Sequence, residues 1–301
     1  MPELPEVTVY VERIAALAVG EPLTRLRLVS PFVLRSVEPP PHAFEGLVLT
    51  SVARLGKRIV LGYQGGLYMV IHLMVAGRLH VRRPAARVGG RADLAAMEFP
   101  SVSLVVTEAG SKRRASLHLV AGAAALAPFR RGGIDLMGAT AATLGEALRR
   151  RNRTLKRALT DPDVVDGVGN AYSDEILHRA RLSPFRQTTA MTDDEVAALL
   201  AGAQAVLREW IERLRAEAGD GLPDRFTALR AEMAVHGRYG KPCPACGSPV
   251  QRIRYADNEA NYCATCQTGG RLLADRALSR LLRADWPRTL MELEEIRRPR
   301  P

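Results

Sequence analysis

The spacing of hydrophobic and polar residues divides the chain into a short helical start, a long alternating stretch and a helical second half. Hydrophobic residues recur at helical spacing from Val7 to Ala18, with Pro5 before them and Gly20 after them, which predicts a helix over residues 5–19. This helix places residues 2 and 3 just before its N-terminus, where the helix dipole favours anionic groups.

Residues 22–120 alternate between hydrophobic and polar side chains in short runs, which is the pattern of half-buried strands. Gly65-Gly66 separates two of these runs and predicts a hairpin formed by residues 58–63 and 67–73. Many short strands at this spacing indicate an antiparallel β-sandwich. The other clear runs are residues 23–28, 101–105 and 114–120.

The helical second half begins at Thr140, shortly after Gly132-Gly133, and no further strand is expected before residue 245. Thr192 and Glu195 have the spacing of a capping box, in which each side chain accepts a hydrogen bond from the other residue's backbone. They predict the start of a long amphipathic helix.

All four cysteines lie in two C-x-x-C pairs, with residues 247–262 between the pairs. Each pair can present two thiolates on one side of a turn, and two such turns form a closed tetrahedral site for one structural Zn²⁺ ion. Two redox pairs or free thiols are the alternative. Between the pairs, Arg252 and Arg254 make residues 251–255 basic and alternating, which favours a hairpin laid against phosphates. The expected metal ligands are Cys243, Cys246, Cys263 and Cys266.

The charge of the chain favours a nucleic acid partner. Its 301 residues carry a formal net charge of +11, with a pI of about 10.1, although a merely basic surface is the alternative.

Acidic residues from Glu3 to Glu12 interrupt any N-terminal signal, and the longest apolar stretch, residues 67–77, is too short to span a bilayer. We therefore expect a cytoplasmic protein with no membrane partner.

Pro2 becomes an N-terminal secondary amine if Met1 is removed, and Glu3 lies directly beside it. An α-amine has a pKa of roughly 7.7–8.0, so much of it is neutral and nucleophilic at working pH. Such an amine can attack an aldehyde-like carbon to form a Schiff base, while a neighbouring carboxyl transfers protons. Taken alone, a proline at position 2 is equally consistent with a chain terminus that has no catalytic role.

Two motifs have the composition of phosphate-binding segments. Asp166-Gly167-Val168-Gly169-Asn170 separates two short helical patterns, so its glycines let backbone N–H groups approach a phosphate, with Lys156 and Asn170 as further donors. Gly110-Ser111-Lys112-Arg113-Arg114 is a basic turn between two strands. An ordinary solvated turn is the alternative in both places.

A third group of candidates lies around two strand ends. Lys57 follows Gly56 at the start of an apolar strand, where it can reach a phosphate or carry a proton. His72, Met74 and Val75 lie at the end of the next strand. Met74 and Val75 are either core residues or an apolar wedge that separates stacked bases.

These motifs, in this order over residues 1–267, resemble the formamidopyrimidine-DNA glycosylase/endonuclease VIII family of DNA repair enzymes. The resemblance implies an α+β fold, with an N-terminal helix and antiparallel β-sandwich followed by a helix–two-turn–helix domain and a four-cysteine zinc finger. The segments that carry it are Pro2–Val7, Gly56-Lys57, Ile71–Leu73, Lys112–Arg114, Asp166–Tyr172, Val235–Cys243 and the four cysteines. The domains expected are a catalytic sandwich at 1–130, the helical domain at 138–240, the finger at 241–267 and a helical extension at 268–301, with a helix between Leu273 and Trp286.

The resemblance implies a bifunctional DNA glycosylase and abasic-site lyase of base-excision repair. Such an enzyme acts as a monomer on damaged double-stranded DNA in a bacterial-type cytoplasm, in association with the nucleoid. The damaged nucleotide is flipped out, the terminal proline attacks C1′ of its sugar, and the Schiff base leads to strand cleavage by β-elimination. The implied catalytic residues are Pro2, Glu3, Glu6 and Lys57. The implied DNA-binding residues are His72, Met74, Val75, Arg113, Arg114, Lys156, Gly169, Asn170, Arg252 and Arg254.

Val75 stands where the purine-specific branch has a methionine, and the chain departs from the family pattern at two further positions. The purine-specific branch has a phenylalanine where this chain has Ala115, and the family finger has an arginine where this chain has Asn258. The second difference predicts that cleavage stops mainly after β-elimination. A non-catalytic DNA-damage-binding protein on the same scaffold is the main alternative, although binding alone needs neither Pro2 nor Glu3. A zinc-ribbon RNA-binding protein is a third possibility, which the N-terminal sandwich does not suit.

Overall fold

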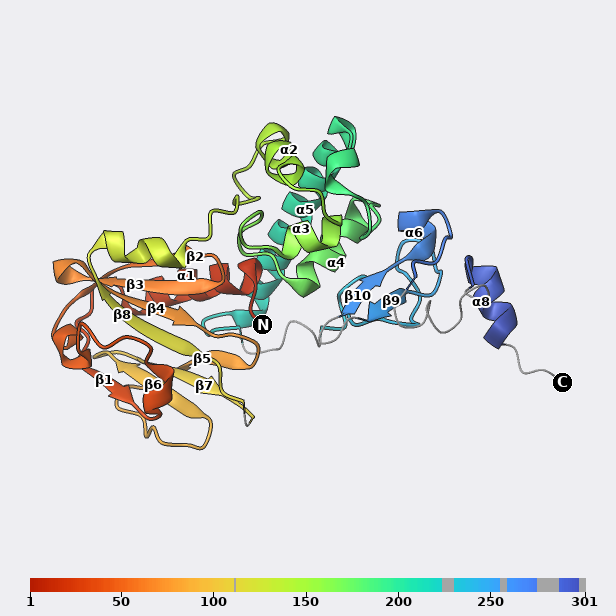
Figure 1. Ribbon diagram of the computed structural model, residues 1–301. Helices are drawn as coiled ribbons and strands as arrows, with labels where there is room; N and C mark the ends of the chain where they lie inside the picture. The colour runs from red at the N-terminus through yellow and green to blue at the C-terminus, as the bar shows by residue number, and fades with distance from the viewer. Residues whose placement is uncertain (111, 224–229, 255–258, 275–286, 298–301) are drawn as a thin grey trace. The chain divides into compact units, whose positions relative to one another are not determined.

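The computed structural model shows two compact units (Figure 1). Unit 1 consists of residues 1–132 and 208–227, and unit 2 consists of residues 133–207 and 228–301. The four domain ranges expected from the sequence stay a prediction. The structure describes the whole chain apart from residues 111, 224–229, 255–258, 275–286 and 298–301.

Unit 1 is a sandwich of two antiparallel sheets with one hydrophobic core. One sheet has the strand order β2-β3-β4-β8 and the other the order β1-β6-β7-β5. Hydrophobic side chains from both sheets, such as Met69 and Leu104, lie in the same buried cluster, which confirms the expected sandwich. The strands are β1 (Arg25–Leu28), β2 (Leu49–Leu55), β3 (Arg58–Tyr63), β4 (Leu67–His72), β5 (Gly77–Arg82), β6 (Asp93–Glu98), β7 (Ser103–Glu108) and β8 (Ser116–Ala121). Short 3₁₀ helices are η1 (Pro31–Val33), η2 (Pro41–Phe44), η3 (Gln64–Gly66) and η4 (Ala123–Phe129).

Helix α1 (Leu4–Ala18) closes the core of unit 1, close to the range expected from its periodicity. Val7, Tyr10 and Ile14 lie in the cluster that both sheets line. The helix begins with a capping box, because the N–H of Glu3 donates to Oε2 of Glu6 at 3.0 Å. The capping box therefore fixes both carboxylates at the first turn of the helix.

The strand register gathers several loops at one end of the sandwich. Arg58 lies opposite His72, and His72 opposite Ser116, so β3 and β8 begin where β4 ends. In the other sheet Gly77 lies opposite Glu108, so β5 begins where β7 ends. Because only four residues join β4 to β5, the turns before β3, β5 and β8 lie at the same end.

The turn between β4 and β5 requires a glycine at its end. The N–H of Gly77 donates to the carbonyl of Leu73 at 2.9 Å, which closes the turn. A Cβ atom at position 77 would lie 2.1 Å from that carbonyl oxygen, so any other residue would force the turn open. Met74 has φ 53°, in the left-handed region, and directs the chain outward before it returns at Gly77.

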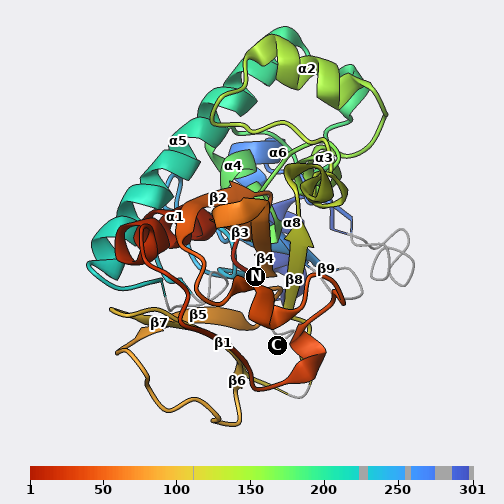
Figure 2. The ribbon, with the colours of Figure 1, turned by 90° about the vertical axis from the view of Figure 1, so that its left-hand side faces the viewer.

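The last part of helix α5 (Asp193–Ala218) belongs to unit 1 and lies beside α1 (Figure 2). Arg215 bonds Glu12 through Nη2 at 2.5 Å, and Nε also donates to this carboxylate at 2.8 Å. The buried phenol of Tyr10 donates to the carbonyl of Pro223 at 2.6 Å. These contacts attach the segment after α5 to the helix that carries Glu3 and Glu6.

Unit 2 is mainly helical and contains the cysteine-bearing segment, which the tail helix α8 follows. The capping box expected at Thr192 is confirmed, since its N–H donates to Glu195 at 2.9 Å and the N–H of Glu195 donates to its hydroxyl at 3.2 Å. The sequence did not predict the tail helix α8, and most of the helix expected over residues 273–286 lies outside the described residues. The elements of unit 2 are α2 (Ala141–Arg149), α3 (Leu155–Thr160), α4 (Asn170–Arg179), η5 (Thr188–Ala190), most of α5, β9 (Gln251–Arg254), β10 (Glu259–Tyr262), α6 (Ala264–Thr268) and α8 (Leu290–Arg297).

Within the described part of the chain, none of the helices has the length and hydrophobicity needed to cross a membrane.

Candidate active site and metal centre

The amino-terminal residues lie in the interior of unit 1. Pro2 is buried, and Glu3 and Glu6 are only 3% and 2% exposed. Burial lowers the pKa of the Met1 amine below its ordinary value, and the charges of Arg78 and Lys57 act in the same direction. Glu3 and Glu6 oppose this shift without reversing it. The surroundings of the amino terminus thus favour a neutral amine next to two carboxyl groups.

Arg78 is a member of this group that the sequence did not indicate. It follows Gly77 in β5, and its Nη1 donates to the carbonyl of Gly77 at 2.5 Å. Leu79 faces the hydrophobic core, so alternation alone would place Arg78 on a solvent-exposed face. The side chain is instead buried beside the amino terminus, a contact between segments far apart in sequence that no local pattern records.

His72 is half-buried and carries no charge at neutral pH. Burial lowers its pKa to about 4, with further lowering by the charges of Arg58, Lys57 and His118. Arg58 lies opposite His72 in the sheet, and Lys57 precedes Arg58. The register therefore brings the expected residues Lys57 and His72 together at one end of unit 1.

The two candidate gap-filling residues differ in exposure. Val75 is 60% exposed, whereas Met74 is half-buried. Both lie in the turn that Leu73 and Gly77 close, so Val75 is presented on a short, fixed segment. An exposed valine contributes little to the core, which favours the wedge interpretation over the core interpretation at this position.

The buried carboxylate of Glu108 fixes the backbone of the basic turn before β8. It accepts hydrogen bonds from the N–H groups of Arg114 and Ala115 at 2.7 and 2.8 Å. The side chains of Arg113 and Arg114 are exposed. Because β8 begins where β4 ends, this turn lies at the same end of unit 1 as His72.

The glycine motif of unit 2 leads directly into α4, as the sequence indicated. Gly169 is the N-cap of this helix and Asn170 its first residue, so the motif forms the N-terminal end of α4, where the helix dipole favours an anion. Lys156 is only 7% exposed and its ammonium points into unit 2. It donates to the carbonyl of Asn170, the hydroxyl of Ser173 and Oδ1 of Asp174, each at 2.7 Å. In this arrangement Lys156 holds the start of α4 through Asn170, Ser173 and Asp174. Its direct contact with a phosphate stays a prediction.

Helix α4 also holds the segment that leads into the cysteine-bearing region. The buried carboxylate of Glu175 accepts three backbone N–H groups, from Ala234, Val235 and His236, at 2.7 to 2.9 Å. Asp174 bonds Nδ1 of His236 at 2.7 Å. The sequence did not indicate this role, because acidic residues within an amphipathic helix usually face solvent.

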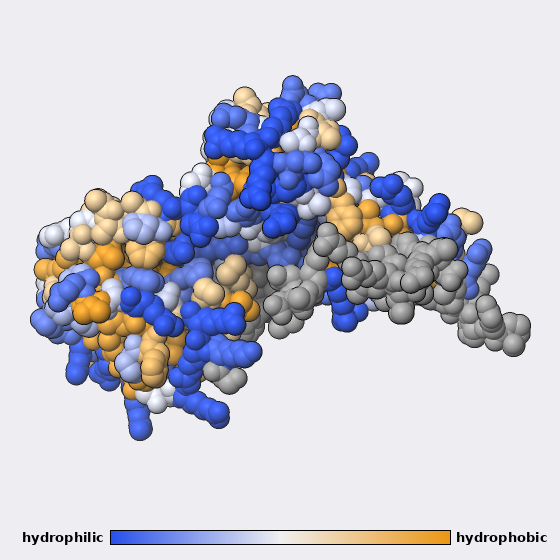
Figure 3. All heavy atoms as spheres, viewed as in Figure 1, coloured by the Kyte–Doolittle hydropathy of each residue, from blue (hydrophilic) through white to orange (hydrophobic). Residues whose placement is uncertain are grey.

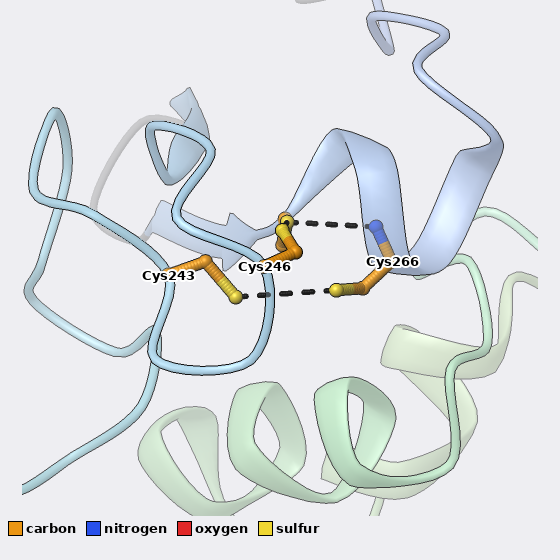
Figure 4. A group of neighbouring side chains, drawn as sticks. Cys243, Cys246 and Cys266 are labelled. Carbon is orange, nitrogen blue, oxygen red and sulfur yellow. Dashed lines mark hydrogen bonds between the residues drawn. The ribbon is translucent and has the colours of Figure 1, made fainter.

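The four cysteines lie together in an arrangement that could hold a metal ion, and Figure 4 shows three of them, Cys243, Cys246 and Cys266. Their sulfur atoms all lie within 4.8 Å of one another. Cys243 and Cys266 are 4.0 Å apart at Sγ, and Cys246 and Cys263 are 3.4 Å apart. A tetrahedral ion with metal–sulfur distances of about 2.3 Å needs sulfur atoms roughly 3.8 Å apart, so this donor set fits Zn²⁺.

Hydrogen bonds to the sulfur atoms also come from outside the cysteine side chains. The N–H of Cys266 donates to Sγ of Cys263 at 3.5 Å, and His178 contacts Sγ of Cys243 through Nε2 at 3.2 Å. Donors of this kind offset the negative charge that four thiolates bring to a divalent ion. His178 lies in the last turn of α4, so the same helix contacts the metal site and begins at the glycine motif.

The hairpin between the cysteine pairs is present, with β9 paired to β10. The guanidinium of Arg252 lies 4.3 Å from the ring centre of Tyr239, and Nη1 is 3.7 Å from Glu259. Arg254 is exposed. Asn258 lies outside the described residues.

Models of known families match three parts of the chain. The N-terminal domain model of formamidopyrimidine-DNA glycosylase matches residues 1–114, and the H2TH domain model of the same enzyme matches residues 136–218. A model described as a zinc finger found in FPG and IleRS matches residues 240–269.

Whole-chain comparisons give the same result. The chain is 33% identical to formamidopyrimidine-DNA glycosylase of Thermus thermophilus over 288 residues, which cover 90% of this chain and 100% of that protein. It is 38% identical over 151 residues to an uncharacterized formamidopyrimidine-DNA glycosylase-like protein of Mycobacterium tuberculosis, across 50% of this chain and 94% of the relative.

The fold is that of Lactococcus lactis Fpg in complex with DNA containing an abasic site. That structure has a TM-score of 0.77 and 22% identity, and the match covers 88% of this chain and 99% of the other. A MutM complex with DNA containing carbocyclic 8-oxo-G matches with a TM-score of 0.77. The α+β fold class expected from the sequence, with its helix–two-turn–helix region and four-cysteine finger, is confirmed.

Proposed function

Because the chain belongs to the formamidopyrimidine-DNA glycosylase family, we propose that it excises oxidised bases from double-stranded DNA and then nicks the abasic strand. The observation that carries the proposal is the buried amino terminus, where Glu3 and Glu6 lie beside the Met1 amine, whose pKa burial lowers. Burial of charged groups is costly, and the capping box of α1 explains only part of it, so two buried carboxylates around the terminus favour catalysis over DNA binding alone. The family relationship also supports action in DNA repair.

The reaction begins once Met1 has been removed and the nitrogen of Pro2 is a free secondary amine. Its electron pair forms a bond to C1′ of the sugar as the bond from C1′ to the damaged base breaks, and the base leaves with the electrons of that broken bond and takes up the proton that the Pro2 nitrogen releases. Glu3 protonates the ring oxygen O4′, the sugar opens, and an iminium ion joins C1′ to Pro2. Loss of a proton from C2′ then expels the 3′ phosphate, which is β-elimination.

The other expected residues bind the substrate in this proposal. Lys57, Arg113 and Arg114 in unit 1, and Gly169 and Asn170 in unit 2, contact phosphates near the lesion. Val75, with Met74 beside it, enters the space that the flipped nucleotide leaves. Arg252 and Arg254 contact phosphates from the finger, which one structural zinc ion holds in shape. The protein acts as a monomer.

Borohydride trapping on a duplex with one abasic site tests the proposal. Reduction of the iminium ion is expected to give a covalent protein–DNA adduct, and peptide mapping is expected to place it on residue 2. A Pro2→Gly variant is expected to trap at least about tenfold more slowly, since the secondary amine is lost. Tight binding without any adduct would identify the protein as a non-catalytic damage-binding protein instead.

Replacement of Arg78 is expected to change the pH dependence of trapping. Arg78 adds to the lowering by burial of the pKa of the Met1 amine, and we expect the same effect on the Pro2 amine once Met1 is removed. Arg78→Gln is therefore expected to raise the pKa of the Pro2 amine, so that the fall of the trapping rate at acid pH begins at a higher pH. Arg78→Lys keeps the positive charge, so its trapping rate is expected to fall at acid pH over the same range as that of wild type. His72 does not produce this fall, because its pKa of about 4 lies below it. A fall that begins at the wild-type pH, or at a lower pH, in Arg78→Gln would contradict the assigned effect.

A further inference from the structure

The three family models leave the end of the chain unmatched. The finger model stops at residue 269, whereas the chain runs to residue 301 and forms α8 near its end. We call residues 270–301 the tail, of which residues 270–274 and 287–297 are described. The proposed reaction uses none of them.

Hydrophobic residues of the tail and of the finger share one buried cluster. Two leucines at the start of the tail lie in it beside side chains of β9, β10 and α6. Leu290 and Leu293 of α8 pack against the same cluster, as does Phe185 from the segment after α4. The buried members of the cluster are Ile253, Tyr262, Ala264, Leu272 and Leu273. The tail therefore supplies part of the hydrophobic core around the finger hairpin.

The finger has few large hydrophobic side chains of its own. Apart from cysteine and alanine, the buried hydrophobic side chains among its described residues are Val250, Ile253 and Tyr262. A segment of this size cannot bury enough surface to fold alone. Figure 3 shows hydrophobic areas among hydrophilic side chains on the part of unit 2 that carries α6. Further hydrophobic cover from the tail stabilises this region.

Backbone hydrogen bonds attach the tail at the same place. The N–H of Leu273 donates to the phenol oxygen of Tyr262 at 2.8 Å. The N–H of Leu272 donates to the carbonyl of Arg288 at 2.8 Å, next to a bridge between Arg271 and Thr289. The residues that lead into α8 are thus joined to the segment that contacts Tyr262.

The tail packs on one face of the hairpin, and the arginines lie on the other. Side chains alternate along a strand, so Ile253 points away from the face that carries Arg252 and Arg254. Ala260 lies opposite Ile253 in the register of the hairpin, which puts Tyr262 on the same face as Ile253. The cluster that the tail completes therefore lies behind the arginines.

Helix α4 holds the hairpin on the arginine face. Asn261 lies opposite Arg252, and its Nδ2 donates to Oδ2 of the buried Asp174 at 3.3 Å. The hairpin is thus supported on both faces, by α4 and by the tail, while Arg254 stays exposed.

We propose that the tail is a positioning element of the finger, which holds the hairpin from behind so that Arg252 and Arg254 face the DNA. The role of these arginines, and so the identity of the partner, rests on the proposed function. The support of the finger does not rest on it, because hydrophobic contacts that form only in the folded finger stabilise it, and metal binding is linked to that folding. The tail thus strengthens metal binding and orients the hairpin through one set of contacts.

Zinc affinity tests the support of the finger. The variant Leu290→Ser/Leu293→Ser, made in the full-length protein, removes the contacts of α8 with the cluster, and competition with a chelator of known affinity measures its zinc binding. We expect about tenfold weaker zinc binding than in wild type, because less hydrophobic surface is buried when the finger folds. Wild-type zinc affinity in this variant would overturn the proposal.

Met291 provides the matched control. It follows Leu290 in α8 but is 73% exposed, so Met291→Ser is expected to keep wild-type zinc affinity. Leu290→Met/Leu293→Met conserves hydrophobic volume and is expected to bind zinc within about twofold of wild type. A loss in Met291→Ser equal to that in the double serine variant would show that α8 does not act through the cluster, and would contradict the proposal.

A double-mutant cycle tests whether the tail acts through the arginines. On a duplex with a non-cleavable abasic-site analogue, and at saturating zinc, the double serine variant is expected to bind about tenfold more weakly than wild type. In the background Arg252→Gln/Arg254→Gln, the same substitutions are expected to change the affinity by less than about twofold, because the contacts that the tail orients are already lost. Equal effects in both backgrounds would overturn the positioning role.

Borohydride trapping separates positioning from catalysis. At saturating protein, the double serine variant and wild type are expected to trap an abasic-site duplex at the same rate. A lower rate at saturation would place the effect of the tail in catalysis and overturn its assignment to positioning. Failure of wild type to trap would contradict the proposed function, whereas the zinc affinities would still decide whether the tail supports the finger.

Discussion

A form of the protein that keeps any residue ahead of Pro2 is expected to give no trapped adduct. In that form the nitrogen of residue 2 is part of an amide, whose electron pair is delocalised into the carbonyl group and cannot attack C1′. The expected loss is about 10³-fold or more, the scale seen when a catalytic nucleophile is removed. Trapping on an abasic-site duplex, quantified by gel shift of the denatured adduct, measures it.

The matched control is the same extended protein with a protease site that leaves Pro2 as the first residue after cleavage. Cleavage is expected to restore trapping, because the buried surroundings of Glu3 and Glu6 are unchanged in sequence. An extended form that traps as fast as the cleaved form would show that another amine, such as that of Lys57, is the nucleophile.

Loss of the finger metal is expected to have the second largest effect. Cys263 is fully buried, and Cys263→Ser or chelation removes a ligand set that folds a segment too short to have its own core. The hairpin with Arg252 and Arg254 then loses its shape. Two lost phosphate contacts at roughly 1.4 kcal/mol each correspond to about 10²-fold weaker DNA binding.

Metal content and DNA affinity, measured on the same preparation, check this expectation. Atomic absorption is expected to give one zinc ion per chain for wild type, and added zinc is expected to restore the affinity of chelated protein but not of Cys263→Ser. Metal-free protein that binds DNA with wild-type affinity would show that the finger plays no part in binding.

The sequence predicted best where one local pattern determines the structure. The hairpin on either side of Gly65-Gly66, the capping box at Thr192 and the cysteine spacing were all confirmed, because each depends on residues close together in the chain. The sequence singled out the Pro2-Glu3 pair for the same reason, as two neighbouring groups with complementary chemistry, and its catalytic role stays a prediction.

The sequence failed where a side chain acts through a contact between distant segments. Arg78 follows the alternation of a strand, and nothing in that alternation shows that the amino terminus lies beside it. Asp174 and Glu175 have the appearance of solvent-facing residues, yet they bind Lys156 and the backbone before the finger. Such pairings depend on the tertiary fold, which places residues about 60 positions apart within hydrogen-bonding distance.

The turn from Leu73 to Gly77 has a consequence for how this protein can diverge. The hydrogen bond from Gly77 to Leu73 and the required glycine at position 77 fix both ends of the turn. Residues 74–76 therefore form a short segment between β4 and β5 whose ends are held in place. The exposed Val75 within it adds little to the core. Substitutions at Val75 can therefore change the side chain that unit 1 exposes at this turn without a comparable change in the free energy of unfolding of the sandwich.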